Sequence, residues 1–116
     1  MSRDKYVLKN IRSVSPHIKL AVFEEAIARQ ITMSDVIGSA LAEKFHRPYE
    51  LSGEKSIRAD LNGDQFMIQI PRALQARIAS RARLTRETES SVVLGVLAEH
   101  FGLIHQPVRR GRRHAA

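Results

Sequence analysis

The chain contains no cysteine among its 116 residues and no long uninterrupted run of apolar residues. The lack of cysteine excludes disulfide bonds and thiolate metal sites. Cysteine usage therefore gives no information about the cellular compartment. No apolar run has the length of a signal peptide or a membrane span. We therefore expect a soluble, cytoplasmic protein with no membrane partner.

Motifs of enzyme chemistry are also missing from the sequence. The five histidines do not have the spacing of a metal site, and the chain has no nucleophile elbow, phosphate loop or paired-carboxylate motif. Its length is sufficient for one domain but short for a large catalytic fold. We expect no enzyme activity, no cofactor and no bound metal.

Acidic residues are scarce relative to basic ones. Twelve Asp and Glu stand against 19 Lys and Arg, which gives a formal net charge of +7. Such a surplus is typical of proteins that bind a polyanion, although it also favours solubility. The segment from Gln65 to Arg86 has no acid at all and carries five arginines: Arg72, Arg77, Arg81, Arg83 and Arg86.

An internal repeat organises the chain. The sequence LAEKF at 41–45 returns as LAEHF at 97–101, an offset of 56 positions. The same offset pairs residues of similar character upstream: Ile18 with Leu74, Val22 with Ile78, Ala26 with Ala82, Thr32 with Thr88, Ser34 with Ser90, Val36 with Val92 and Ile37 with Val93. One register kept over so many positions indicates two diverged copies of one unit.

Each copy has the pattern of two helices. Apolar residues follow a helical spacing that restarts once within each copy. Ser15 before Pro16 predicts the start of the first helix, and Thr32 followed by Asp35 predicts the start of the second. In the second copy the helices follow Pro71 and Thr88.

A strand precedes the helices of each copy. In residues 65–70, Phe66, Ile68 and Ile70 alternate with polar or longer side chains, which predicts a strand with one buried face. Residues 7–14 are its expected partner, although their alternation is poorer. The predicted fold is mostly α with a short two-stranded antiparallel ribbon.

The two copies are too short to fold separately. Each has about 36 residues, so neither can bury a core unaided. We expect one domain over residues 1–106, built of repeats at about 7–45 and 65–103. A linker at 46–64 is long enough to return the chain antiparallel, and residues 107–116 are expected to form a disordered basic tail.

The order strand, helix, helix, with Pro71 at the strand-to-helix junction and hydroxyl residues opening the last helix, resembles the ribbon-helix-helix (Arc/MetJ/CopG) family of repressors. The resemblance covers about residues 9–45 and 65–101. It implies a ribbon that enters the major groove of DNA. Two copies in one chain resemble the tandem arrangement of the conjugation protein TraY, a pseudo-dimer whose DNA site need not be palindromic.

Base-reading candidates come from the outward positions of the ribbon. The resemblance places Gln65, Met67 and Gln69 there, and glutamine can both donate to and accept from adenine. For the first strand, the offset of 56 aligns Lys9, Ile11 and Ser13 with the reading face, whereas Asn10 and Arg12 have the better chemistry for bases. Because burying Arg12 unpaired would be costly, either a β-bulge shifts the strand or Arg12 lies at its margin and contacts a phosphate. Both sets remain candidates.

Phosphate contacts are expected at the starts of the later helices, because helix N-termini present free amides and a partial positive charge. The candidates are Thr32, Met33, Ser34, Thr88, Glu89 and Ser90, with Arg72 beside them; helix capping alone is the simpler interpretation. The tail arginines Arg109, Arg110, Arg112 and Arg113 are expected to track phosphates or enter a minor groove, or to have no role.

The sequence thus predicts specific binding of double-stranded DNA. The resemblance makes a transcriptional repressor or autoregulator the first hypothesis, and a plasmid-transfer or recombination accessory protein the second. A hypothesis of another class is an antitoxin-like interaction module, which the basic tail disfavours. One ribbon spans few base pairs, so we expect several molecules to associate cooperatively on adjacent sites.

Overall fold

The structure is a computed structural model that describes residues 5–51 and 63–108. Six elements follow one another along the described chain. In order they are β1 (Tyr6–Arg12), α1 (Pro16–Arg29), α2 (Met33–Phe45), β2 (Gln65–Pro71), α3 (Arg72–Thr85) and α4 (Glu89–Phe101).

The two strands form one antiparallel sheet, as the sequence predicted. The register pairs Tyr6 with Pro71, Val7 with Ile70, Leu8 with Gln69, Lys9 with Ile68, Asn10 with Met67, Ile11 with Phe66 and Arg12 with Gln65. The strand β1 is therefore shifted toward the N-terminus relative to the predicted 7–14. The predicted fold class, mostly helical with a short antiparallel ribbon, is confirmed at this level.

Side-chain caps set the starts of three helices at the predicted residues. The Ser15 hydroxyl accepts the amide of Ile18 at 3.3 Å, and the Thr32 hydroxyl accepts the amide of Asp35 at 3.0 Å. Thr88 repeats the second cap on α4. Each cap satisfies one of the amides that the first helical turn leaves without an intrahelical partner.

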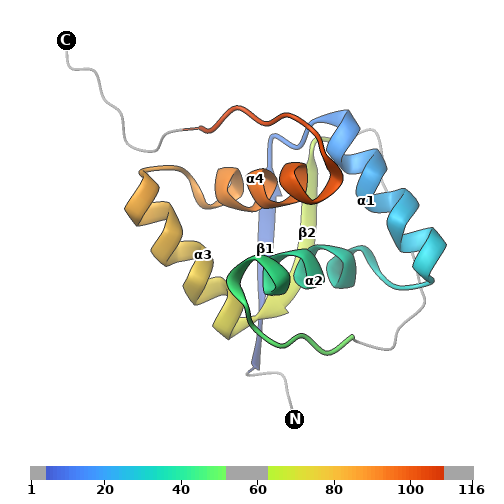
Figure 1. Ribbon diagram of the computed structural model, residues 1–116, viewed down its shortest axis with the longest axis horizontal. Coiled ribbons are helices and arrows are strands. Elements are labelled where there is room, and N and C mark those ends of the chain that lie inside the picture. Colours follow the sequence, from blue (N-terminus) through green and yellow to red (C-terminus); the bar gives the residue numbers. More distant parts are fainter. Residues whose placement is uncertain (1–4, 52–62, 109–116) are drawn as a thin grey trace.

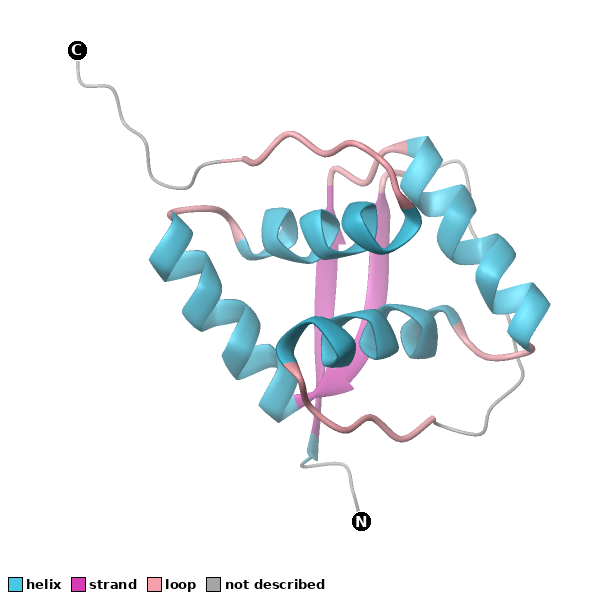
Figure 2. Ribbon diagram, viewed as in Figure 1, coloured by secondary structure: helices cyan, strands magenta, loops and turns pink. Residues whose placement is uncertain are grey.

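The helices cover one face of the ribbon and leave the other uncovered. Helices α2 and α4 cross the strands side by side, while α1 and α3 lie along the two flanks (Figures 1 and 2). One hydrophobic core joins residues of all six elements, including Ile11 and Ile70 of the ribbon and Ile37 and Val93 of the helices above it. Burial of this apolar surface is the main contribution that holds the ribbon against the helices.

The helices and the strands keep different offsets between the two halves. Helix α1 starts at Pro16 and α3 at Arg72, 56 positions apart, as in the sequence repeat. The strands start at Tyr6 and Gln65, which are 59 positions apart. The difference arises because three residues, 13–15, separate β1 from α1, whereas β2 leads directly into α3.

The segment after each repeat folds back along its last helix. The Tyr49 hydroxyl donates to the buried Asp35 carboxylate of α2 at 2.8 Å, and His105 Nε2 lies 3.1 Å from the buried Ser91 hydroxyl of α4. Tyr49 and His105 are themselves 56 positions apart. The matching contacts thus extend beyond residue 45, where the predicted linker was expected to begin.

Candidate nucleic-acid interface

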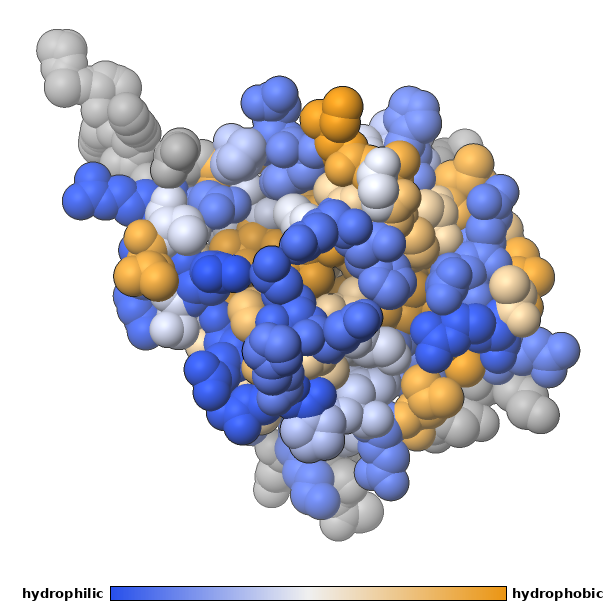
Figure 3. Space-filling model, viewed as in Figure 1, coloured by the Kyte–Doolittle hydropathy of each residue, from blue (hydrophilic) through white to orange (hydrophobic). Residues whose placement is uncertain are grey.

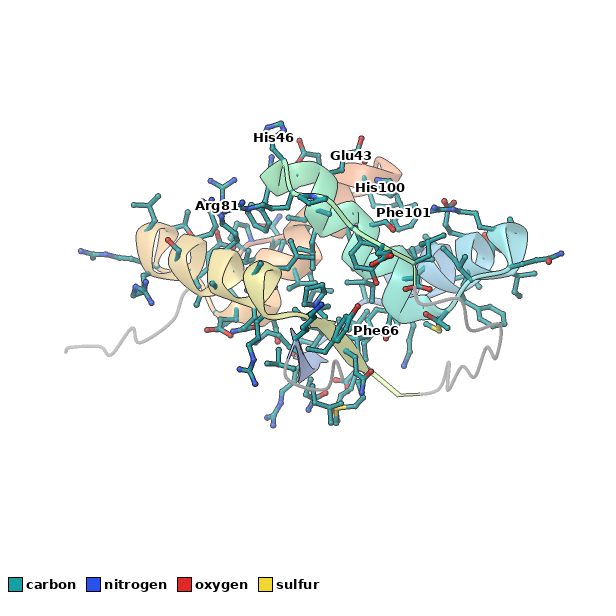
Figure 4. All side chains as sticks on the ribbon, turned by 90° about the horizontal axis from the view of Figure 1, so that it is seen from below. Glu43, His46, Phe66, Arg81, His100 and Phe101 are labelled. Atoms are coloured by element: carbon teal, nitrogen blue, oxygen red, sulfur yellow. The ribbon has the colours of Figure 1, made fainter. Side chains whose placement is uncertain are left out.

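The outer face of the ribbon is open to solvent. Directly paired residues of antiparallel strands point to the same face, and the side chains of successive residues alternate between faces. The outer set comprises Tyr6, Leu8, Asn10 and Arg12 of β1 with Pro71, Gln69, Met67 and Gln65 of β2. Leu8 and Met67 are 65% and 64% exposed, although both are large and apolar. In Figure 4 the strands lie along one side of the molecule with the helices on the other.

On β2, the predicted outward residues are in their expected places. Gln65, Met67 and Gln69 are exposed, while Phe66 and Ile68 between them are at most 4% exposed and face the helices. Their orientation follows from the alternation in the sequence. Their contact with bases stays a prediction.

On β1, the face assigned by the offset of 56 is wrong. Ile11 is fully buried, and Lys9 faces the helices, where its ammonium pairs with Glu89. Asn10 and Arg12 are the residues on the outer face. The physical reason is that an odd number of residues, Ser13 to Ser15, lies between the strand and α1, and an odd shift exchanges the two faces of a strand.

Ser13 lies beyond the strand and is not part of the paired ribbon. Its φ is 61°, and the amide of Val14 donates to the Asp64 carbonyl at 2.9 Å. That bond is one residue out of the register that pairs Arg12 with Gln65, so Ser13 is an extra residue of the kind found in a β-bulge. The backbone is thus bulged after Arg12, which is the last residue of the strand. Whether Arg12 contacts a phosphate stays a prediction.

Two outward residues, Tyr6 and Leu8, were missing from the sequence prediction. They continue the alternation of Arg12 and Asn10 toward the N-terminus. The alternation that places them outward was present in the sequence, but it identifies them only once the inward face of β1 is assigned correctly. Once Ile11 is taken as buried, Leu8 and Tyr6 follow.

The N-termini of α2 and α4 are fastened to the two edges of the ribbon. The Ser34 hydroxyl accepts the amide of Gln69 at 3.2 Å, and the Ser90 hydroxyl accepts the amide of Arg12 at 3.0 Å. These two strand amides point away from the partner strand, so the bonds hold a helix start beside each edge. The sequence predicted Ser34 and Ser90 as interface residues but not this role in fixing the helix to the strand.

The first turn of α2 retains donors. The Thr32 hydroxyl caps Asp35, and within the described chain the amides of Met33 and Ser34 have no hydrogen-bond acceptor. Such amides, together with the helix dipole, favour a phosphate or another anion. Their contact with phosphate remains a prediction.

The first turn of α4 differs from that of α2 in the place of its acidic residue, which is Glu89 rather than Asp35. Glu89 occupies the position of Met33, and a carboxylate there would repel a phosphate. Its charge is offset by Lys9, which reaches it from the inner face of the ribbon, and Gln75 donates to the same oxygen at 3.0 Å. The structure therefore places Glu89 as an internal ion-pair partner, with Thr88 capping Ser91 beside it at 3.0 Å.

The arginines of α3 are spread around the helix rather than gathered on the ribbon side. Arg72, at its start, is exposed next to the end of β2, and Arg77 and Arg83 are also exposed. Arg81 lies toward the side away from the strands (Figure 4). Of this group, Arg72 is thus the one that directly follows the ribbon.

The described chain ends at residue 108, beside the start of α4. The amide of Thr88 donates to the Val108 carbonyl, and the amide of Val108 donates to the Ser91 hydroxyl, each at 2.9 Å. Residue 108 is therefore held within the fold, although the predicted tail began at 107. The tail residues Arg109, Arg110, Arg112 and Arg113 lie outside the described residues.

The face opposite the ribbon carries mixed charges. A hollow of about 320 Å³ between α2 and α4 is lined by Glu43, Lys44, Glu99 and His100 with Ala40 and Val96. Glu43 and His100 lie on the side of the helices away from the strands (Figure 4), and hydrophilic residues on this face alternate with small apolar areas (Figure 3). Because acids and bases pair there, including Lys44 with Glu99 at 2.9 Å, this face is a poor surface for a polyanion.

Other classes of site find no support in the described residues. Over residues 5–51 and 63–108, no cluster of three or more His, Asp or Glu side chains is arranged to hold a metal ion. Within the same ranges no helix has the length and apolar character needed to cross a membrane.

Comparison with known proteins found no matching family model, no matching curated protein and no matching solved structure.

Proposed function

We propose that this chain binds double-stranded DNA sequence-specifically by placing its ribbon in the major groove, as a tandem ribbon-helix-helix pseudo-dimer. One observation carries the proposal: among the described residues, the outer face of the ribbon is exposed and presents alternating side chains, with a capped helix start at each edge. A two-stranded ribbon fits a groove about 12 Å wide, and the flanking helix starts lie where the phosphates that border the groove would pass.

Several features of the chain support the tandem interpretation. The helices of the two halves have equal lengths, start 56 positions apart and open with equivalent threonine caps. Each half also attaches a helix start to a strand edge through a serine hydroxyl, Ser34 or Ser90. In a pseudo-dimer both strands of the ribbon come from one chain, so the protein needs no second copy to complete its interface.

The biological role that we propose is repression of transcription, including that of the chain's own operon, by a cytoplasmic protein without enzyme activity. Such a protein acts by occupying DNA. The non-identical strands also suit a plasmid-transfer or recombination accessory protein, because these two halves present different residues to an asymmetric origin.

The test starts with selection of duplexes from a random pool. We expect one sequence to be enriched and to bind at least about a thousandfold more tightly than random duplex at physiological salt. The logarithm of the affinity should fall linearly with the logarithm of the salt concentration, because phosphate contacts release counterions. Failure to enrich any sequence would contradict the proposal.

A substitution in the ribbon then tests the mode of binding. Gln69→Ala should reduce the preference for the selected duplex over random duplex by about 1–3 kcal/mol. Ser80→Ala, an uncharged change at an exposed position of α3, is the matched control and should leave both affinities unchanged. Equal loss on the two duplexes from Gln69→Ala would show that this residue does not read bases.

Cooperative binding is tested on longer fragments. A ribbon of seven-residue strands spans about 20 Å, or roughly six base-pair steps. That length is short for a specific site, so neighbouring molecules are expected to bind adjacent sites. A gel-shift titration that gives a single 1:1 complex on every long fragment would exclude this part of the proposal.

A further inference from the structure

The outer face of the ribbon is symmetric at its centre and asymmetric at its ends. The central pair of the register is Lys9 with Ile68, both facing inward. Exchanging the strands about this pair replaces Leu8 by Met67 and Asn10 by Gln69, so an apolar residue replaces an apolar one and an amide replaces an amide. The two central outward pairs therefore present the same chemistry in both directions along the groove.

The ends of the ribbon do not share this symmetry. At one end Arg12 stands opposite Gln65, and at the other Tyr6 stands opposite Pro71. The first end offers a guanidinium and an amide. The second offers a half-buried phenol and a proline, which has no side-chain donor or acceptor.

The side chain of Arg12 is free to act outside the fold. Its backbone amide is held by the Ser90 hydroxyl at 3.0 Å, which fixes the residue at the strand end. Within the described chain its guanidinium makes no hydrogen bond or ion pair. A guanidinium donates to O6 and N7 of guanine in a bidentate arrangement, which is the commonest specific contact in the major groove.

The central outward residues of the ribbon favour A·T base pairs rather than guanine. The amides of Asn10 and Gln69 fit N6 and N7 of adenine, while Leu8 and Met67 offer apolar contact to thymine methyl groups. The Oδ1 atom of Asn10 is enclosed and has no hydrogen-bond partner in the described chain. Turning this amide outward to meet the N6 amino group of adenine would relieve that cost.

Resting on the proposed DNA binding, we infer that this chain recognises a one-sided operator: an A/T-rich, nearly palindromic centre with a guanine read by Arg12 at one end only. Successive outward residues of a strand are about 6.8 Å apart, which equals two base-pair steps. Arg12 is three residues from the centre of the ribbon. The guanine therefore lies roughly three base pairs from the centre of the site, and the symmetric position on the other side carries no guanine preference. This fixed polarity orients the protein on its site.

The experiment compares the sequences selected by the native chain with those selected by Arg12→Ala. The native chain should enrich an A/T-rich centre with guanine on one side. Arg12→Ala should lose the guanine preference by about 5- to 140-fold while keeping the centre. Arg83→Ala, at an exposed position of α3, is the control and should leave the selected sequence unchanged.

The possible outcomes distinguish failure of the proposed DNA binding from failure of the one-sided operator. If no sequence is enriched, the proposed DNA binding itself fails. If a sequence is enriched with guanine on both sides or on neither, DNA binding stands and the one-sided operator is wrong. If Arg12→Ala keeps the guanine but lowers the salt dependence by about one ion, Arg12 contacts a phosphate and the inference is likewise overturned.

Discussion

The ion pair between Lys9 and Glu89 gives a sharp test of how the ribbon is held to α4. The Lys9 side chain is 14% exposed and that of Glu89 is 31% exposed, so the pair is mostly removed from water. Gln75 donates to the same carboxylate oxygen. In the other half the corresponding positions are apolar, Ile68 on the strand and Met33 on the helix, so the fold does not need a charge at this place.

The substitution Lys9→Met keeps an unbranched side chain but removes its charge. Breaking a fully buried pair costs about 3–5 kcal/mol, and an exposed pair is worth about 0.2–1 kcal/mol. Because a third of Glu89 still reaches water, we expect Lys9→Met to lower the free energy of unfolding by about 2 kcal/mol. Adding Glu89→Gln removes the stranded charge and keeps an acceptor for Gln75, so the double variant should recover most of the loss.

The assay is urea unfolding followed by far-ultraviolet circular dichroism, since the chain has no tryptophan. A double-mutant cycle over Lys9 and Glu89 should give a coupling energy of about 1–3 kcal/mol. The matched control is the same cycle over Lys44 and Glu99, which are 34% and 66% exposed and should couple by less than about 1 kcal/mol. Equal coupling in the two cycles would refute the argument from burial.

Three further predictions concern stability. Thr32→Ala and Thr88→Ala should each lower the free energy of unfolding by about 1 kcal/mol in urea titrations, because each removes a helix cap. Gly38→Ala should lower the free energy of unfolding by about 1–3 kcal/mol, because its Cβ would overlap the ring of Tyr49. Gly95→Ala meets only an ordinary contact at 3.5 Å, so it should leave that free energy unchanged or raise it. The opposite order of the two variants would contradict the packing. Burial, followed by the hydrogen bond to the Asp35 carboxylate, raises the pKa of Tyr49 above its usual 10.0. The stability that the protonated Tyr49 contributes is therefore complete below pH 10 and declines at higher pH. A Tyr49→Phe variant that loses stability equally steeply above pH 10 would contradict this.

The helices could be predicted from the sequence because their determinants are local. Ser15 and Thr32 bond to amides three residues further along the chain, so cap and helix start lie in the same short segment. The strand β2 was equally accessible, because Phe66, Ile68 and Ile70 alternate strictly and Pro71 ends the run. These features needed no knowledge of the rest of the fold.

Contacts between distant segments could not be predicted in the same way. Nothing in the neighbourhood of Lys9 indicates that its partner is Glu89, eighty positions later. The packing of Tyr49 on α2 was also missed, because residues after 45 have few apolar side chains. The offset of 56 does extend beyond Phe45 and pairs Tyr49 with His105, the two residues that contact Asp35 and Ser91.

The face of β1 shows where a sequence repeat stops determining a structure. Helical positions repeat every 3.6 residues and tolerate a short insertion before the helix starts, whereas a strand exchanges its faces with every odd shift. The three residues between β1 and α1 therefore leave the helix register intact and invert the strand. What decides the face is the free energy of burial: Ile11 contributes to the core at no electrostatic cost, while Arg12 in its place would be a buried charge without a partner. A repeat carried mainly by helices thus fixes where the ribbon lies, but which residues form its outer face depends on which side chains the core can accept.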